Sequence, residues 1–394
     1  MKKNILLLAG TIVAILTGGI LVRSNPGTSA APTPTVENQP SILVSTSVPA
    51  ASPTPYPEDV IRLAWFYKPP DESQRDFVRD NFDFFVLTHK DENERNQLKA
   101  DGLNVPISQY LLFLTINDPG GCEEGPPGNQ VAYKTGDFCQ ISEQHPDWFL
   151  IDDSGERIKA GKSSYFMDPG NEGFRAFWLE RARELQESHA WDNIFLDNVE
   201  ASLAKMAKDD RKVAKYPDDA SYQRAVEGFL NYIRTSYFQP RGKPMYANIV
   251  SVREDPVWDG YMQYLDGALI ESFATDWEDG YPSRDSWEEE LEQAEVALAQ
   301  GKTLILVGQG THEDKQLQTF AFASYLLISD GNAYFRYTNS DSYRDLWMYD
   351  NYNIDLGRPL GNRVKNENEW RRDFENGYVI VNPKDHKAQI VINP

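Results

Sequence analysis

The chain of 394 residues is poor in the residue types that hold metals and bind nucleic acids. It has only two cysteines and five scattered histidines, which form no HxxxH, HxH or HExxH pair. No zinc site is therefore expected, and no cofactor is indicated. Basic residues number 39 against 60 acidic ones, a formal charge of −21, and they form no basic run. This balance argues against nucleic acid and against an anionic membrane surface as partners, and it leaves neutral polar partners such as carbohydrate.

Charged residues are also missing from Asn4 to Val22, a stretch that follows two lysines and is about long enough to span a bilayer. We therefore expect residues 1–23 to be a membrane anchor or a signal peptide, and the uncleaved anchor is favoured because no clean cleavage site follows. Residues 24–57 are rich in Pro, Ser and Thr, which predicts a disordered linker. The globular domain, 58–394, would then be extracytoplasmic and contact the membrane only through the N-terminal segment.

Eight short apolar runs alternate with amphipathic stretches in the globular part. The runs are Arg62–Tyr67, Phe84–Thr88, Ile107–Phe113, Asn193–Asp197, Met245–Ile249, Gly267–Glu271, Thr303–Val307 and Ala333–Tyr337. Because they are nearly apolar throughout rather than alternating, they indicate strands buried on both faces, as in a parallel sheet. Asn171–His189, Ala220–Phe238 and Ser286–Gln300 have the apolar spacing of helices between such strands.

These repeats predict a (β/α)8 barrel. The main alternative, an open doubly wound sheet, usually has a Gly-rich turn after its first strand, but Lys68-Pro69-Pro70 stands there. A long insertion between the third and fourth strands, about Asn117–Gly161, is expected to form a rim of the active-site cleft. It holds Cys122 and Cys139, which in an exported chain should form a local disulfide. The tail Gly377–Ile392 predicts a small β hairpin packed against the barrel.

Two acidic residues that end apolar runs carry the functional prediction. The C-terminal ends of barrel strands point into the active site, and the fourth and sixth strands end in Asp197 and Glu271. Two carboxylates over one cleft suit glycoside hydrolysis, in which one protonates the leaving oxygen and the other attacks the anomeric carbon or activates water. The alternative roles are structural, with Asp197 as a helix cap and Glu271 in a salt bridge.

Position also suggests residues that would contact the substrate. Asp168 precedes the helix that leads into the fourth strand, although Asp-Pro-Gly-Asn also suits a turn. Tyr67 ends the first strand, where it can line the cleft, and Trp65 is expected to face the same side two residues earlier. Other strand ends supply His89, Asn198, Asn248, Gln309 and Arg336.

Four segments, HPDWFLIDDSGERI, FMDPGNEGFRAFW, WDNIFLDNVEAS and WRRDFENGYVIVNP, carry a resemblance to a known family. Most of the globular part resembles the barrels catalogued as hypothetical glycosyl hydrolase family 15, which are distantly similar to bacterial endo-α-1,4-polygalactosaminidases. The resemblance implies a (β/α)8 barrel that hydrolyses polysaccharide. It matches family acids to Asp168, Asp197 and Glu271, and it implies structural roles for tail residues such as Trp370 and Arg372.

The sequence thus predicts an exported, surface-anchored or secreted glycoside hydrolase that cleaves O-glycosidic bonds of an extracellular polysaccharide. We expect it to act as a monomer and, because of its acidic charge, not to bind nucleic acid. Asp197 would be the nucleophile or base, Glu271 the general acid, and Asp168 a neighbour that binds substrate or tunes a pKa. The alternative is a barrel of the cell envelope that binds polysaccharide without cleaving it. A salt bridge that neutralises Glu271, or a cleft filled by the insertion, would favour that alternative.

Overall fold

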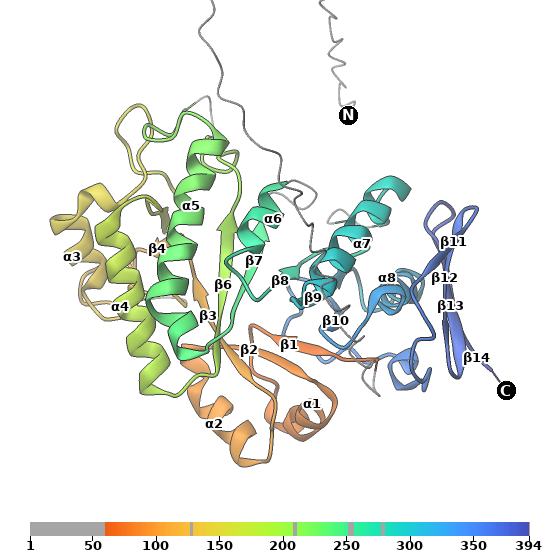
Figure 1. The fold of residues 1–394 in the computed structure, drawn as a ribbon. Helices are drawn as coiled ribbons and strands as arrows, with labels where there is room; N and C mark the ends of the chain where they lie inside the picture. The colour runs from red at the N-terminus through yellow and green to blue at the C-terminus, as the bar shows by residue number, and fades with distance from the viewer. Residues whose placement is uncertain (1–59, 127–128, 208–210, 251–255, 277–279, 394) are drawn as a thin grey trace, which may run out of the picture. The chain divides into compact units, whose positions relative to one another are not determined.

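Eight parallel strands organise the computed structural model, which describes residues 60–126, 129–207, 211–250, 256–276 and 280–393 (Figure 1). In their order in the sheet, they are β1 (Ala64–Phe66), β2 (Phe84–Thr88), β3 (Ile107–Leu112), β6 (Asn193–Glu200), β7 (Met245–Val250), β8 (Gly267–Ile270), β9 (Thr303–Gln309) and β10 (Ala333–Thr338). A parallel bridge between Leu63 and Phe335 connects the first strand to the last. The predicted (β/α)8 barrel is confirmed.

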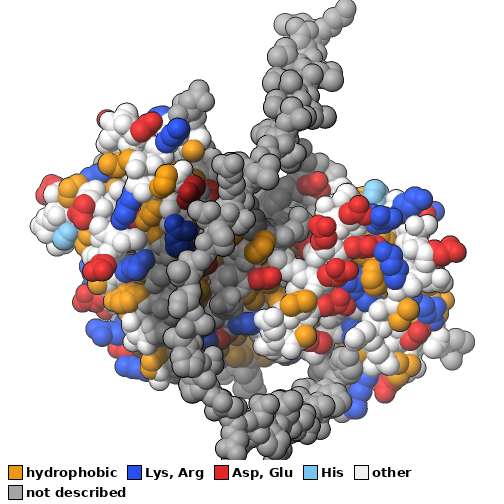
Figure 2. All heavy atoms as spheres, turned by 45° about the horizontal axis from the view of Figure 1, so that its top comes forward, with side chains coloured by type: hydrophobic (Ala, Val, Ile, Leu, Met, Phe, Trp, Pro, Cys, Tyr) orange, Lys and Arg blue, Asp and Glu red, His pale blue; other side chains and the backbone are white. Residues whose placement is uncertain are grey.

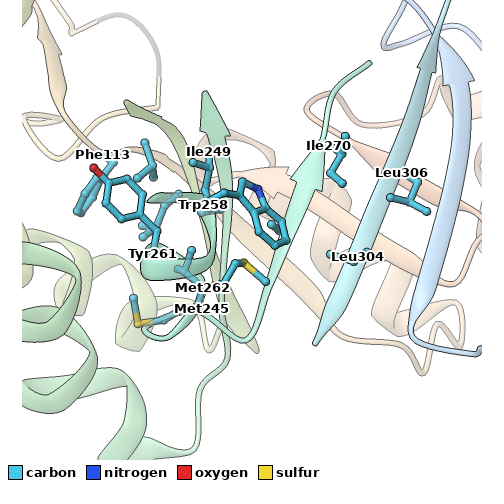
Figure 3. Packing of buried hydrophobic residues seen from close by; sticks show 14 of the residues in the cluster. Phe113, Met245, Ile249, Trp258, Tyr261, Met262, Ile270, Leu304 and Leu306 are labelled. Atoms are coloured by element: carbon cyan, nitrogen blue, oxygen red, sulfur yellow. The ribbon is translucent and has the colours of Figure 1, made fainter. Parts of the chain in front are cut away.

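Helices follow the strands and cover the outside of the barrel (Figure 1). They are α1 (Arg75–Asn81), α2 (Glu92–Ala100), α4 (Glu172–Ser188), α5 (Asp219–Ile233), α6 (Pro256–Met262), α7 (Arg284–Ala299) and α8 (Lys315–Ile328). Their apolar faces pack on the strands, as Figure 3 shows for Trp258 and Met262 of α6 beside Met245 and Ile249 of β7. This burial of apolar surface is the main stabilising contribution to the barrel.

The predicted insertion lies between β3 and α4 and has structure of its own. It contains β4 (Thr115–Asn117), which pairs antiparallel with β5 (Ser164–Phe166), and the helix α3 (Asp137–Gln144). The expected disulfide between Cys122 and Cys139 is confirmed, and it ties the preceding loop to α3. Arg181 of α4 forms an ion pair of 2.8 Å with the buried carboxylate of Asp137, so the insertion is also fixed to the barrel's outer helices.

The C-terminal region is larger than the predicted hairpin. The hairpin is present as β13 (Gly377–Asn382) and β14 (Lys387–Ile392), but β11 (Val364–Asn366) and β12 (Glu369–Phe374) extend it to a four-stranded antiparallel sheet. The prediction was too small because β12, with the sequence EWRRDF, reads as polar. One of its arginines, Arg372, is buried and donates hydrogen bonds to backbone carbonyls of Leu326 and Ser329 at the end of α8. Arg372 thus has the structural role that the resemblance implied.

The barrel has two apolar regions. Its interior is filled by side chains that include Phe66, Phe84, Phe195, Leu269 and Val307. The larger region lies between the strands and the outer layer and includes nine of the fourteen residues of α8, which the C-terminal sheet covers. Most charged side chains of the described residues lie on the surface, and on the face shown in Figure 2 the acidic and basic ones are interspersed.

The N-terminal predictions fall outside this part of the chain. The proposed anchor at 1–23 and the linker at 24–57 precede the first described residue. Within the described ranges, no helix has both the length and the apolar character needed to cross a bilayer.

Candidate active site

Asp197 lies in the second half of β6, Glu271 directly follows β8, and the two carboxylates share one hydrogen-bond donor. Asn248 of β7, the strand between β6 and β8, donates through Nδ2 to Asp197 Oδ1 at 3.1 Å and to Glu271 Oε2 at 3.0 Å. Both partners are carboxylate oxygens, so the nitrogen of the amide must face them. The barrel therefore brings together the two acids that the sequence places more than seventy residues apart.

The shared donor fixes the spacing of the two carboxylates. The two N–H bonds of an amide nitrogen diverge by about 120°, which puts the accepting oxygens about 5 Å apart at these distances. This separation matches glycosidases that form a covalent intermediate, whereas enzymes that activate a water between the carboxylates need about 6.5–9.5 Å.

Asp197 is buried and held by neutral donors. Only 8% of the residue is exposed, and Tyr110 Oη and Asn198 Nδ2 donate to Oδ2 at 2.5 Å and 3.0 Å. Among the described residues no lysine, arginine or histidine forms an ion pair with it. Burial raises the pKa of Asp197 to about 6; the hydrogen bond from Tyr110 opposes this shift, and the charge of Glu271 adds to it.

A break in strand geometry places Asn198 beside Asp197. Asn198 has a φ of 56°, in the left-handed region, and the pairing of β6 with β7 shifts register between Leu196 and Val199. Asparagine tolerates this conformation better than most residues do. Because of the irregularity, the side chain of Asn198 reaches Asp197, and Val199 packs in the outer apolar region.

Glu271 borders an open cavity. The cavity has a volume of about 740 Å³, and its lining includes Asn198, Asn248 and Glu271. Tyr343, from the loop after β10, donates to Glu271 Oε1 at 2.6 Å, and Gln309 Nε2 lies 3.4 Å from the Tyr343 hydroxyl oxygen. Thus Glu271 is accessible from the cavity, while Asp197 lies more deeply.

Tyr67 has an unusual backbone and an unpartnered hydroxyl. Its φ is 72°, and its ring packs edge-on against Tyr110 and Tyr343, with centroid distances of 5.2 Å and 5.0 Å. The hydroxyl is buried and makes no hydrogen bond within the described structure. Burial, followed by the charges of Asp197 and Glu271, raises its pKa well above the usual value. A strained, unsatisfied polar group beside two acids is a feature of functional sites.

The prediction that Trp65 faces the same side as Tyr67 is wrong. Trp65 packs against Phe82 in the outer apolar region, with its ring edge-on at 5.3 Å, whereas Phe66 and Tyr67 both contact the interior cluster. Alternation along a strand requires extended backbone, and the left-handed conformation at Tyr67 ends it.

Two predicted substrate contacts lie in other networks. The buried carboxylate of Asp168 accepts hydrogen bonds from Tyr216 Oη at 2.5 Å and from Lys215. His89 lies after β2 with its ring 5.7 Å from that of Tyr133 in the insertion, and burial lowers its pKa to about 4. Neither residue hydrogen-bonds to Asp197 or Glu271, so the structure does not bring them into the central network.

Tyr110 and Tyr343 contact the central acids although neither was predicted as a site residue. Tyr110 lies within a barrel strand, where a tyrosine is usually taken as part of the core, and only its hydrogen bond to Asp197 reveals its role. Tyr343 follows the last barrel strand in an irregular loop, and no spacing connects it with Glu271.

The buried carboxyl of Asp197 predicts a pH-dependent effect of Asp197→Asn on stability. Below about pH 4 this carboxyl is protonated in both the folded and the unfolded state. Between about pH 4 and 6 it ionises only in the unfolded state, so the wild-type protein loses stability as the pH rises. Relative to wild type, the variant should gain up to about 3 kcal/mol of unfolding free energy between pH 4 and pH 7. Urea denaturation at several pH values measures this gain, and a constant difference between the two proteins would contradict the assignment.

The unpartnered hydroxyl predicts that Tyr67→Phe stabilises the fold. Removing a buried hydroxyl without a partner should increase the free energy of unfolding by about 1 kcal/mol. Tyr110→Phe is the matched control, because it removes a hydroxyl that donates to Asp197 and should destabilise the protein. Urea denaturation of both variants at pH 7 provides the comparison. Equal losses of stability would show that the Tyr67 hydroxyl is satisfied in solution.

Comparison with solved structures finds glycosidases at low sequence identity. The glycoside hydrolase domain of PelA from Pseudomonas aeruginosa aligns with 17% identity and a TM-score of 0.49, covering 73% of this chain and 97% of that one. The noncanonic maltogenic α-amylase AmyB from Thermotoga neapolitana aligns with 11% identity and a TM-score of 0.48, covering 82% and 85%. A search of curated proteins gives no match.

A family model gives the more specific result. The model described as hypothetical glycosyl hydrolase family 15 matches residues 110–378, which is more than half of the chain. The match extends from β3 to the start of β13 and includes Asp197, Asn248 and Glu271. The chain belongs to the hypothetical glycosyl hydrolase family 15, which places it among the glycosidases.

Proposed function

We propose that this glycosidase is exported and cleaves O-glycosidic bonds in an extracellular polysaccharide with Asp197 and Glu271 as its catalytic pair. The observation that carries the proposal is the bridge through Asn248, whose amide nitrogen donates to one oxygen of each carboxylate at 3.1 Å and 3.0 Å. Membership of a glycosyl hydrolase family supports the reaction class. Export follows from the charge-free N-terminal segment.

The environments of the two acids suggest their roles. Glu271 borders the cavity and would protonate the leaving oxygen of the glycosidic bond. Asp197 lies deeper and would attack the anomeric carbon, forming a glycosyl-enzyme ester as the bond to the leaving oxygen breaks. Water, activated by the Glu271 carboxylate, would then hydrolyse the ester. The close spacing favours this nucleophilic role of Asp197 over that of a base acting through water.

A polar sugar suits the remaining side chains around the pair. Tyr67 offers a hydroxyl with no protein partner, and Asn248, whose nitrogen is occupied by the carboxylates, has its amide oxygen left as an acceptor. Asn198 also lines the cavity. These groups would bind sugar hydroxyls, and a cavity of about 740 Å³ is within the usual range for small-molecule sites.

Two observations favour hydrolysis over binding alone. In the described part of the chain, Glu271 accepts from Tyr343 and Asn248 and has no ion pair that would neutralise it. The cavity beside it is open rather than filled by the insertion. We propose that the protein acts as a monomer.

Reducing-end release from a panel of extracellular polysaccharides tests the activity. The panel includes galactosamine-containing polymers and α-glucans, and the purified protein should release product from at least one polymer. Asp197→Asn and Glu271→Gln should each lower the rate at least about 1,000-fold, because each removes a group that reacts in the covalent mechanism.

Asp285→Asn is the control for these variants, because it changes an exposed carboxylate on α7 and should retain wild-type turnover. Polysaccharide binding by all variants without product from any polymer would instead support the binding barrel. Full activity of either active-site variant would reject the assignment of that carboxylate.

The spacing of the pair also predicts the stereochemistry of the product. A covalent intermediate on Asp197 requires two displacements at the anomeric carbon, so the first sugar released should retain the configuration of the substrate. Proton NMR of the reaction, recorded before the product mutarotates, measures this configuration. An inverted first product would show that water attacks directly and that Asp197 is a base.

A further inference from the structure

Arg336, in β10, is a buried cation that donates to backbone rather than to an acid. The residue is 5% exposed, and its guanidinium packs over the rings of Trp65 and Phe66, with its central carbon 4.3 Å and 4.7 Å from their centroids. No described carboxylate forms an ion pair with it. Burying an unpaired charge is unfavourable, and Nη1 has no hydrogen-bond partner in the described structure, so the polar contacts of this cation are those that Nη2 makes.

Those hydrogen bonds hold the loop that follows β10. Nη2 of Arg336 donates to the carbonyl oxygen of Tyr343 at 2.7 Å and to that of Asp345 at 3.3 Å. The ring of Tyr343 packs edge-on against Phe66 and Tyr67 at centroid distances of 5.2 Å and 5.0 Å. Arg336 therefore holds the backbone of Tyr343, and Phe66 and Tyr67 hold its ring.

The hydroxyl of Tyr343 ends on the acid of the site. It donates to Glu271 Oε1 at 2.6 Å, and because Gln309 offers an N–H at 3.4 Å, its own proton is directed to the carboxylate. Asn248 contacts the other oxygen, Oε2. The carboxyl group is thus held at both oxygens, which fixes its orientation toward the cavity.

We propose that Arg336 is a positioning residue that acts through Tyr343 to hold a hydrogen-bond donor on Glu271. The catalytic consequence rests on the proposed function, in which Glu271 gives a proton to the leaving oxygen and becomes a carboxylate. A donor already in place at Oε1 stabilises that carboxylate without reorganisation. Arg336 itself contacts neither carboxylate; its effect passes through the position of one loop tyrosine.

Fluorine NMR tests this linkage without a substrate. The full chain is labelled with 3-fluorotyrosine, and among its 20 tyrosines the resonance of Tyr343 is the one lost in Tyr343→Phe. Arg336→Met should move that resonance toward the value of an exposed tyrosine, and Glu271→Gln should also move it. Arg372→Met is the matched control, because Arg372 is another buried arginine that donates to backbone carbonyls, at the end of α8, and its loss should leave the Tyr343 resonance in place.

Kinetics on the polymer that the wild-type protein cleaves distinguish positioning from general support of the fold. Arg336→Met and Tyr343→Phe should each lower kcat about 10- to 100-fold with little change in KM, the usual effect of losing one strong hydrogen bond to a charged group. The double variant should lose no more than Tyr343→Phe alone. Guanidinium added below its denaturing concentration should restore the kcat of Arg336→Ala. It should not restore the kcat of the variant that combines Arg336→Ala with Tyr343→Phe.

The possible results of these experiments distinguish a failure of the positioning role from a failure of the proposed function. An unmoved Tyr343 resonance in folded Arg336→Met, or losses of kcat that multiply in the double variant, would overturn the positioning role. If circular dichroism shows that Arg336→Met does not fold, the same measurements on Arg336→Lys test the positioning role instead. If the wild-type protein cleaves no polymer, the hydrolase proposal fails, while the fluorine experiment still decides whether Arg336 positions Tyr343 on Glu271.

Discussion

The buried carboxyl of Asp197 is the constraint on which the site depends. A carboxylate removed from water is stabilised here by hydroxyl and amide donors, with no ion pair in the described structure, so ionisation is made harder by burial and by the neighbouring charge of Glu271. Tyr110, Asn198 and Asn248 reduce that cost without cancelling the negative charge. An anion held in this way keeps its reactivity toward an electrophilic carbon, which an arginine partner would reduce.

The scaffold supplies this environment through departures from regular strand geometry. Tyr67, directly after β1, and Asn198, within β6, both have left-handed backbone, and each brings a side chain to the mouth that regular alternation would direct elsewhere. Such strain is sustained only because the surrounding barrel is well packed. Arg336 extends the same arrangement to an irregular loop, whose Tyr343 completes the contacts of Glu271.

The barrel and its central acids could be predicted because short stretches of the sequence are enough to indicate them. Apolar runs of strand length define β6 and β8, and an acid at the end of such a run has few alternatives to the barrel mouth. The tyrosines that donate to these acids could not be predicted. Tyr343, for example, lies 72 residues after Glu271 in a loop without periodicity. The orientation of Trp65 was missed because one positive φ reverses it, and β12 was missed because its buried Arg372 looks polar.

Asp197 and Glu271 are electrostatically coupled in a buried site. Carbon-13 NMR of the Asp197 carboxyl, recorded against pH in the wild-type protein and in Glu271→Gln, measures that coupling directly. Asp197 should titrate with a pKa of about 6 in the wild type and at a lower pH in the variant, because the charge of Glu271 contributes to the upward shift. Titration of Asp197 near its ordinary value, with no response to Glu271→Gln, would contradict this coupling.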